Sequence, residues 1–422
     1  MVATFPAGRP APAYADLTAV ELSGDERGWT DLVKRSDASF DTVIHCPFGG
    51  SGRDGAEGEI RSAWLTAKFA NTLLPENGGK LLTLITSPEG NDAVDRAAAS
   101  AAIAQAGRAA MLDASKLGIA ICSNRMEISR HAPAMQIEQT IEAFIGDRTS
   151  FLAGAQVALG HVVGTPGDFD LAGRTYLVTG ATSGIGRATA IEIARRGGWV
   201  AVGGRKLELA RETVELARAA GGDGMFVPLD ITQEIDWQRA VTSIMAERGQ
   251  LDGLVNNAGD AKNLPIQDLP EETLRYLVHL NYAGCRAGMI AAVDALAETG
   301  GAIVNVASVA GIRAGYGGSA YGASKSAMIA LSSAFAEQVA QPRGVRVNSI
   351  QPGLIWSDSV VESLGEEGAA AFRRMVEAKT PLGRVGTPDE VARFIAFLVS
   401  GAAASISGQA IPVSGGLELL FP

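Results

Sequence analysis

Short apolar runs alternate with amphipathic stretches of helical length through the second half of the chain. The runs are YLVTG, WVAVGG, MFVPLD, LDGLVNNAG, AIVNVAS, VRVNSIQPG and QAIPVSGG, and stretches such as GRATAIEIARRG and SKSAMIALSSAFAEQVAQ separate them. Buried parallel strands form continuous apolar runs, and helices connect them. The pattern therefore predicts an α/β fold with a doubly wound, Rossmann-like parallel sheet over residues 173–422.

The first half of the chain carries a weaker form of the same pattern. The stretch FDTVIHCPFGG at residues 40–50 aligns with LDGLVNNAGDA, and GGKLLTLIT at residues 78–86 aligns with GGAIVNVAS. Further on, FLAGAQVALG aligns with SISGQAIPVS. We interpret residues 14–160 as a truncated, degenerate Rossmann-like domain, a second copy of the fold that begins at its third strand.

Two segments outside these patterns set the predicted domain boundaries. Residues 1–13 contain proline and alanine without a basic region or an apolar core, so we expect a flexible leader there. Glycines and a proline interrupt residues 161–172, which we expect to form the linker between the two domains.

Composition narrows the classes of function and location. The formal net charge of -10 argues against a surface for nucleic acid or for an anionic membrane. The 3 cysteines are odd in number and far apart, which is typical of a reduced, cytoplasmic protein. The 4 scattered histidines lack metal-ligand spacing, so no metal site is expected. No apolar run approaches the roughly 18 residues that span a bilayer.

A glycine-rich loop follows the first strand of the second half. In TGATSGIGRATA, residues 179–190, Gly180, Gly184 and Gly186 fall on the turn from strand to helix. Bare backbone N–H groups and the positive end of a helix suit a dinucleotide pyrophosphate. The alternative is a merely tight turn, which the register of strand, glycines and helix disfavours.

The end of the second strand bears on cofactor choice. An NAD-selecting fold usually places an acid there to bind the ribose 2′-hydroxyl. This chain has Gly204 at that position, followed by Arg205 and Lys206. A guanidinium can pair with a 2′-phosphate, so NADP(H) is favoured. The alternative is a solvated basic start to the following helix.

Tyr321 and Lys325 lie four residues apart in SAYGASKSA and so share one face of a predicted helix. A nearby ammonium stabilises a phenolate and should lower the pKa of Tyr321 from about 10. Tyr321 is therefore a candidate general acid/base for an alcohol or carbonyl. Ser308, at the end of the preceding strand AIVNVAS, strengthens that assignment.

Over about residues 171–417 the chain resembles the classical short-chain dehydrogenase/reductases. The resemblance rests on an ordered set of motifs: the glycine loop, Asp230 with Ile231, the run Asn256–Gly259, Asn281, Ser308, Tyr321 with Lys325, Pro352 with Gly353, TPLGRVGTPDEVA and SGQAIPVSGG. One departure is Ser414, where the family usually has an acid, and we expect it to affect subunit packing only.

The resemblance implies a role for each of four catalytic residues. Tyr321 would exchange a proton with the substrate oxygen, and Ser308 would polarise that oxygen. Lys325 would hold the nicotinamide ribose and lower the pKa of Tyr321. Asn281 would fix a water that links Lys325 to solvent.

The resemblance also extends the predicted cofactor site along the chain. The cofactor-binding residues expected in full are Gly180, Thr182, Ser183, Gly184, Ile185, Gly186, Arg205, Lys206, Asp230, Ile231, Asn257, Ala258, Gly259, Tyr321, Lys325, Pro352, Gly353, Ile355 and Ser357.

The predicted activity is an NADP(H)-dependent interconversion of a ketone and a secondary alcohol, favoured in the reductive direction. Ile312, Tyr316 and Trp356 are candidates for an apolar substrate pocket. A 3-oxoacyl-thioester reductase, acting on acyl carrier protein or CoA thioesters, is an alternative because TPLGRVGTPDEVA resembles that subgroup. An alternative of another class is a non-catalytic nucleotide-sensing or scaffold protein, against which the intact catalytic set argues.

The first copy lacks this chemistry. Thr86 replaces the serine, and no tyrosine or lysine lies between Glu89 and Ser115. The family commonly forms tetramers through long central helices, and the alanine-rich stretch 96–115 has the small residues that close helix contact needs. We therefore expect the first copy to act as a pseudo-subunit, so that a homodimer imitates the family tetramer. It could instead shape the entrance to the substrate pocket.

Overall fold

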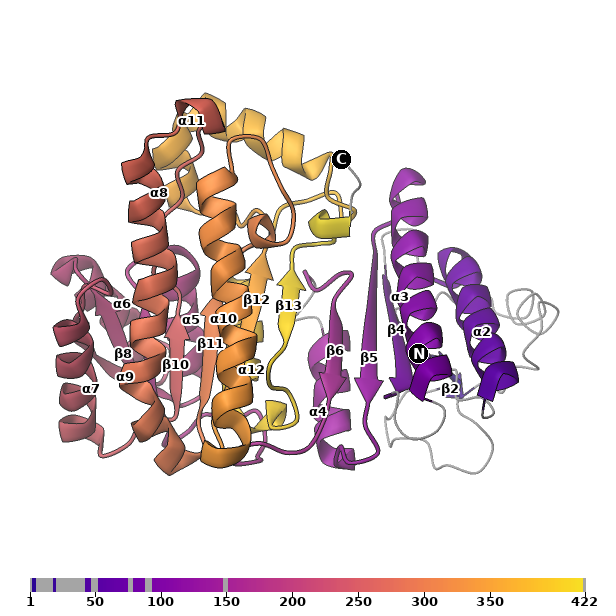
Figure 1. Ribbon diagram of the computed structural model, residues 1–422, viewed down its shortest axis with the longest axis horizontal. Coiled ribbons are helices and arrows are strands. Elements are labelled where there is room, and N and C mark those ends of the chain that lie inside the picture. The colour runs from indigo at the N-terminus through magenta and orange to yellow at the C-terminus, as the bar shows by residue number, and fades with distance from the viewer. Residues whose placement is uncertain are drawn as a thin grey trace. The chain divides into compact units, whose positions relative to one another are not determined.

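The computed structural model divides the chain into two compact units (Figure 1). The described residues are 2–4, 18–19, 42–46, 52–74, 79–87, 93–146 and 151–419. Unit 2 consists of Val162–Phe372 and Gly386–Val413. Unit 1 consists of Met1–His161 and two segments from the second half of the sequence, Arg373–Val385 and Ser414–Pro422.

A fully parallel sheet of 7 strands forms the centre of unit 2, in the order β13-β12-β11-β10-β7-β8-β9. Its strands are β7 (Thr175–Thr179), β8 (Trp199–Gly204), β9 (Asp223–Pro228), β10 (Gly253–Asn256), β11 (Ala302–Val306), β12 (Arg346–Pro352) and β13 (Ala410–Val413). The central strands are buried along their whole length, as their apolar sequences require.

Helices cover both faces of this sheet. On one face α7 (Glu234–Arg248) packs beside α9 (Gly284–Thr299), which lies beside α10 (Ser319–Arg343); on the other, α5 (Gly184–Arg195) lies between α6 (Leu207–Ala219) and α12 (Pro388–Val399) (Figure 1). The predicted doubly wound fold is confirmed. The remaining helical segments of the unit are α8 (Glu271–Leu277), the π-helical η4 (Val278–Ala283), most of α11 (Asp358–Glu377), and the short turns η3 (Ile266–Asp268), η5 (Val309–Gly311) and η6 (Gly401–Ala403).

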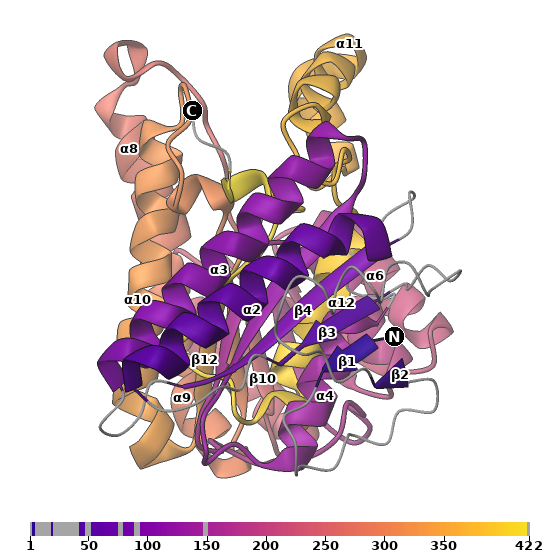
Figure 2. The ribbon, with the colours of Figure 1, turned by 90° about the vertical axis from the view of Figure 1, so that its right-hand side faces the viewer.

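Unit 1 contains a second parallel sheet, of 6 strands in the order β2-β1-β3-β4-β5-β6. Its helices α2 (Gly52–Leu73) and α3 (Ala93–Lys116) lie side by side (Figure 2), and Leu65, Leu81 and Ile121 are buried among them and the sheet. The other elements are β1 (Val2–Thr4), β2 (Thr18–Ala19), β3 (Thr42–His45), β4 (Gly79–Thr86), β5 (Ile121–Ile128), β6 (Gln156–Leu159), α4 (Ala134–Ile145) and η7 (Leu417–Leu419). Within the described part of the chain, no helix is both long and apolar enough to cross a membrane.

The structure corrects several boundaries expected from the sequence. β1 pairs with β3, so the sheet does not begin at residues 40–50, and the described part of residues 1–13 is a strand rather than a leader. The division between the two units falls between His161 and Val162, at the start of the expected linker, and Leu171 near the end of that segment is fully buried. Two segments of the domain predicted over residues 173–422, Arg373–Val385 and Ser414–Pro422, belong to unit 1 instead.

One buried asparagine closes the loop before the last strand of unit 1. The Asn124 side-chain amide donates to the Leu152 carbonyl over 2.9 Å, and its Oδ1 accepts the Ala155 N–H at 3.0 Å. Gly154, inside this loop, has a φ of 77°, a conformation that residues with a Cβ rarely adopt.

Unit 2 contains the same arrangement before its own last strand. The Asn348 amide donates to the Ile406 carbonyl over 2.9 Å, and its Oδ1 accepts the Gln409 N–H at 3.0 Å. The enclosed Gly408 has a φ of 75°. The two loops therefore share one hydrogen-bond pattern and one glycine conformation.

Candidate active site

The glycine loop of unit 2 is shaped by close backbone approaches. Gly180 has a φ of 62°, and a Cβ there would lie 2.8 Å from Ala258 Cα. A Cβ on Gly186 would lie 2.4 Å from the Gly180 carbonyl oxygen. Because contacts this short do not occur, only glycine fits either position, and the loop leads directly into the N-terminus of α5.

Hydrogen bonds fasten the loop after β10 to the end of β7. The Thr179 hydroxyl oxygen accepts the backbone N–H groups of Asn257 and Ala258, each at 3.0 Å. In return, the Asn257 amide donates to the Thr179 carbonyl over 3.0 Å. The two loops therefore form one rigid wall at the carboxyl end of the sheet, where open α/β sheets bind their ligands.

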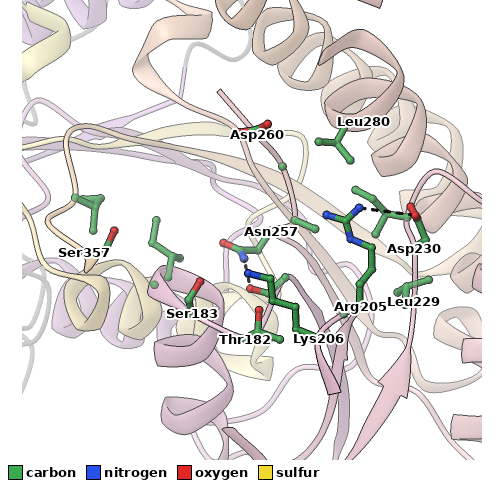
Figure 3. A pocket seen from close by; sticks show the side chains of 18 of the residues that line it. Thr182, Ser183, Arg205, Lys206, Leu229, Asp230, Asn257, Asp260, Leu280 and Ser357 are labelled. Atoms are coloured by element: carbon green, nitrogen blue, oxygen red, sulfur yellow. Dashed lines mark hydrogen bonds and ion pairs between the residues drawn. The ribbon is translucent and has the colours of Figure 1, made fainter. Parts of the chain in front are cut away.

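A cavity of about 470 Å³ lies against this wall (Figure 3). Its size lies within the usual range for small-molecule sites. Most of the predicted cofactor residues line it: Gly180, Thr182, Ser183, Gly184, Ile185, Arg205, Lys206, Asp230, Ile231, Asn257, Ala258, Gly259, Ile355 and Ser357. The other predicted residues, which are not among those lining the cavity, are Gly186, Tyr321, Lys325, Pro352 and Gly353.

Two basic side chains extend from the end of β8 along the cavity (Figure 3). The Arg205 guanidinium lies 3.9 Å from the Asp230 carboxylate, and its side chain is 71% exposed. The pKa of Asp230 is lowered, first by the hydrogen bond from the Thr232 hydroxyl and also by the charge of Arg205. This end of the cavity therefore presents two cations that an anionic group can reach.

Ser308 and Tyr321 come together from two neighbouring elements. Ser308 lies two residues after the end of β11, and its hydroxyl oxygen accepts the Ala310 N–H at 3.1 Å, which caps η5. Tyr321 lies in the first turn of α10 and forms a side-chain hydrogen bond with Ser308. The pair thus presents two adjacent hydroxyl groups.

Lys325 is buried one helical turn after Tyr321. Its ammonium donates to the Val306 carbonyl over 2.8 Å and lies 6.0 Å from the centre of the Tyr321 ring. Burial lowers the pKa of Lys325 to about 8, partly opposed by the neighbouring Cys285.

The expected lowering of the Tyr321 pKa is not found. Burial raises the pKa of Tyr321, and the charge of Asp260 raises it further, whereas the hydrogen bond with Ser308 acts in the opposite direction. Desolvation of the phenol therefore outweighs any stabilisation of its anion in this structure. At neutral pH Tyr321 is protonated.

A π-helical turn places Asn281 beside these residues. Its amide donates to the Asp260 carbonyl over 3.0 Å and to the Ser324 hydroxyl over 2.9 Å, and its Oδ1 accepts the Asp260 N–H at 3.1 Å. A Cβ on Gly259 would lie 2.7 Å from Asn281 Oδ1 and 3.4 Å from Lys325 Nζ. This π turn, a feature often found at functional sites, thus places Asn281 near the same glycine as Lys325.

The predicted site residues omit five residues that line the cavity: Gly204, Leu229, Asp260, Tyr276 and Leu280. The sequence analysis named Gly204 only as the position where an acid is missing. Leu229 and Asp260 adjoin Asp230 and Gly259, so adjacency to a motif could have found them. Tyr276 and Leu280 come from α8 and η4, which carry no such signal. The Tyr276 hydroxyl donates to the Asp260 carboxylate over 3.1 Å.

The predicted substrate residues do not gather at the cofactor cavity. Ile312 and Tyr316 line a second cavity of about 520 Å³, which abuts the first turns of α10. Trp356 is not among the residues that line either cavity. Its backbone N–H donates to the Gly386 carbonyl over 2.8 Å. The structure thus brings two of the three together and leaves Trp356 apart.

The second half of the chain is similar in sequence to known oxidoreductases. A family model described as enoyl-(acyl carrier protein) reductase matches residues 180–418. Cyclopentanol dehydrogenase from Comamonas sp. (strain NCIMB 9872) is 35% identical over 58% of this chain and 96% of its own length. The 3-oxoacyl-acyl-carrier-protein reductase FabG of Thermotoga maritima is 33% identical over 59% of this chain and 99% of its own.

Solved structures of short-chain type dehydrogenases/reductases are similar to the same part of the chain. A short-chain type dehydrogenase/reductase from Mycobacterium marinum is 32% identical, with a TM-score of 0.55, over 59% of this chain and 97% of its own. A short-chain type dehydrogenase/reductase from Mycobacterium ulcerans is 35% identical, with a TM-score of 0.56, over 59% of this chain and 91% of its own. The chain belongs to the short-chain dehydrogenase/reductase family, whose members use nicotinamide cofactors. It is accordingly an oxidoreductase that acts on alcohol or carbonyl groups.

The pKa of Lys325 predicts a pH dependence. A buried ammonium with a pKa of about 8 is charged below that pH and neutral above it. Because a neutral lysine no longer stabilises negative charge on Tyr321, kcat for carbonyl reduction should fall as pH rises through about 8. A pH–rate profile measures this directly. In Lys325→Arg, whose charge persists, any residual activity should not decline in that range, and a wild-type profile that stays flat to high pH contradicts the assignment.

Proposed function

We propose that the protein is an NADP(H)-dependent reductase that converts a ketone into a secondary alcohol. The observation that carries the proposal is the hydrogen-bonded pair of Ser308 and Tyr321, with the buried Lys325 beside it. A protonated phenol next to a second hydroxyl suits a carbonyl oxygen that must be polarised and then protonated. The raised pKa of Tyr321 favours the reductive direction, because reduction begins with the acid form.

Each of the four residues has its own role in the proposed reduction. The Ser308 hydroxyl donates a hydrogen bond to the carbonyl oxygen and so stabilises the negative charge that develops there. Tyr321 transfers its proton to that oxygen as the C–O double bond becomes single. The Lys325 ammonium stabilises the resulting phenolate. Asn281, held through the Asp260 backbone, keeps the path from Lys325 toward solvent open for the return of a proton.

The residues present fit a nicotinamide dinucleotide. Gly180 and Gly186 leave bare backbone at the start of α5, where a Cβ would collide, so a pyrophosphate can approach the N–H groups of Thr182 to Ile185. When bound, the reduced cofactor supplies the hydride. We propose NADP(H) rather than NAD(H), because Arg205 and Lys206 line the cavity where β8 ends in Gly204 instead of an acid.

A 3-oxoacyl thioester is the second candidate substrate class. The match to the FabG of Thermotoga maritima favours it, while the match to cyclopentanol dehydrogenase favours a simple cyclic ketone. Reduction of acetoacetyl-CoA and of cyclopentanone, compared by kcat/KM, separates the two classes. If neither of these nor a broad carbonyl panel is turned over although NADPH binds tightly, a nucleotide-sensing role replaces the enzymatic proposal.

Tyr321→Phe removes only the phenolic hydroxyl. General acid catalysis speeds a reaction by roughly 10²–10⁴-fold, so kcat should fall by at least about 10²-fold. The Kd for NADPH should stay nearly unchanged. Initial rates and a fluorescence titration with NADPH give the two quantities. Tyr282→Phe is the matched control, since Tyr282 lies on the same π turn as Asn281 but is not among the residues that line the cavity. Retained turnover in Tyr321→Phe removes Tyr321 from the mechanism.

Arg205→Ala tests the choice of cofactor. Loss of a charge-assisted contact with a 2′-phosphate should weaken NADPH by about 1.5–3 kcal/mol and leave NADH nearly unaffected. The Kd of each cofactor is measured for wild type and variant. Arg211→Ala, an exposed arginine paired with Glu208, serves as control. Equal losses for NADPH and NADH refute the assignment.

We also propose that the first half of the chain is a degenerate copy of unit 2, as the sequence of residues 14–160 suggests, and that the strand Val2–Thr4 belongs to the same copy. The strand order of unit 1 equals that of unit 2 with the third strand omitted. His45 pairs with Thr83 where Asn256 pairs with Asn305, which agrees with the alignment of residues 40–50 and 78–86. The shared asparagine-closed loops support the same conclusion.

His45 and Cys46 in this copy are structural. Burial lowers the pKa of His45 to about 3 and raises that of Cys46 to about 12, so both side chains are neutral at physiological pH. The 3 cysteines of the chain are buried thiols, which supports the reducing cytoplasm as its location.

A chain with one working copy should bind one NADPH and assemble as a homodimer in which the degenerate copies replace two subunits of the family tetramer. Fluorescence titration gives the number of NADPH molecules per chain, and light scattering gives the mass. Two NADPH molecules per chain would show that the first copy binds nucleotide, and a monomer would exclude the pseudo-tetramer.

A further inference from the structure

Asp260 is bonded through its backbone to the π-helical turn η4. Its N–H donates to Asn281 Oδ1 over 3.1 Å, and its carbonyl oxygen accepts the Asn281 amide at 3.0 Å. These two bonds hold the main chain at Asp260 whatever side chain it carries. The proposed reduction uses them but gives the Asp260 carboxylate no role.

Both oxygens of the Asp260 carboxylate have partners. Oδ1 accepts the Ala261 N–H at 2.8 Å. Oδ2 accepts the Tyr276 hydroxyl at 3.1 Å and lies 3.4 Å from the Lys262 ammonium. Because the backbone of Asp260 is also held, its carboxylate is a fixed point to which the end of the Tyr276 side chain is attached.

Tyr276 and Asn281 contact the same residue although they are five positions apart. In a regular α-helix, neighbours on one face are three or four residues apart. The π-helical turn Val278–Ala283, a type of turn in which hydrogen bonds span five residues, begins between them. This wider turn accounts for how both side chains reach Asp260.

The Tyr276 side chain belongs to the wall of the cofactor cavity. It is 45% exposed although its hydroxyl is bonded. Leu280, four residues further on, also lines the cavity, as do Leu229 and Ile231 from the segment after β9 (Figure 3). An aromatic ring among aliphatic side chains suits the packing of a flat ligand ring.

Nearby charges place Tyr276 at the Arg205 end of the cavity. Burial raises the pKa of Tyr276, the charges of Asp260 and Asp230 raise it further, and the charge of Arg205 lowers it. Exposed charges act over roughly 10 Å, so Tyr276 lies near the pair of Arg205 and Asp230. If Arg205 takes the ribose 2′-phosphate as proposed, the adenine on the same ribose belongs at this end.

We infer that Tyr276 is a cofactor-binding residue that recognises the adenine ring, and that the Asp260 carboxylate is the tether that holds its ring in the cavity wall. The inference rests on the proposed binding of a nicotinamide dinucleotide but not on reductase activity. NADPH and NADH carry the same base. Tyr276 therefore strengthens the binding of both, whereas Arg205 distinguishes between them.

The first test measures Kd by calorimetry for NADPH, NADH and ADP-ribose, which carries adenine but no nicotinamide. Tyr276→Ala should raise all three Kd values by at least about fivefold, because stacking of a base on an aromatic ring contributes at least that much. Tyr276→Phe keeps the ring and should retain most of the affinity. Leu274→Ala is the control, since Leu274 lies on the same helix but is not among the residues that line the cavity.

Two results overturn the assignment of the ring. One is that Tyr276→Ala leaves the three Kd values within about twofold of wild type. The other is that Tyr276→Phe binds as weakly as Tyr276→Ala. A loss in Leu274→Ala equal to that in Tyr276→Ala would likewise show that the helix, not the ring, is responsible.

The second test addresses the tether with Asp260→Ala, which leaves the backbone bonds to Asn281 in place. This change should weaken ADP-ribose by at least about twofold in the wild-type background and should not weaken it in Tyr276→Ala, because the carboxylate acts through the ring. Equal effects in the two backgrounds, including none, overturn the tether.

Binding and turnover separate this inference from the proposed function. Wild-type protein that binds NADPH and ADP-ribose but reduces no ketone contradicts the proposed reductase, and the Tyr276 variants still decide the inference. Wild-type protein that binds neither ligand contradicts both.

Discussion

The site depends on two glycines that let separate segments of backbone and side chain approach each other. At Gly180 the first loop meets the loop after β10, and a Cβ there would lie 2.8 Å from Ala258 Cα. At Gly259 that second loop meets Asn281, with Lys325 directly behind it. The same short stretch of chain therefore builds one wall of the cofactor cavity and one side of the catalytic group. A side chain at Gly180 would collide with Ala258, and one at Gly259 would collide with the Asn281 side chain.

Burial decides the charge states of Tyr321 and Lys325, the proposed acid/base residues. It raises the pKa of Tyr321 and lowers that of Lys325 to about 8, so both groups move toward their neutral forms. A phenol that holds its proton is suited to protonating a carbonyl oxygen, and a lysine that titrates near 8 can return a proton under mild conditions. These charge states support the proposed reduction for reasons that the Tyr-x-x-x-Lys spacing alone does not contain.

The sequence predicts the fold of unit 2 and most of the cofactor cavity because each motif is local: a strand, its turn and the next helix lie together in the chain. It does not predict features that depend on packing between distant segments. The strand at Val2–Thr4 is too short to show periodicity, and the desolvation of Tyr321 depends on everything packed around it. The same is true of Asp260 and Tyr276, which are bonded only in the folded chain.

The central claim is that a carbonyl carbon accepts hydride from a nicotinamide while Tyr321 protonates its oxygen. The most direct measurement supplies NADPH that carries deuterium at the transferable position of the nicotinamide, together with a ketone that the enzyme reduces, and analyses the alcohol by mass spectrometry and NMR. The account predicts one deuterium on the carbinol carbon of wild-type product and almost no product from Tyr321→Phe. Deuterium released to solvent, or label at another carbon, would contradict it.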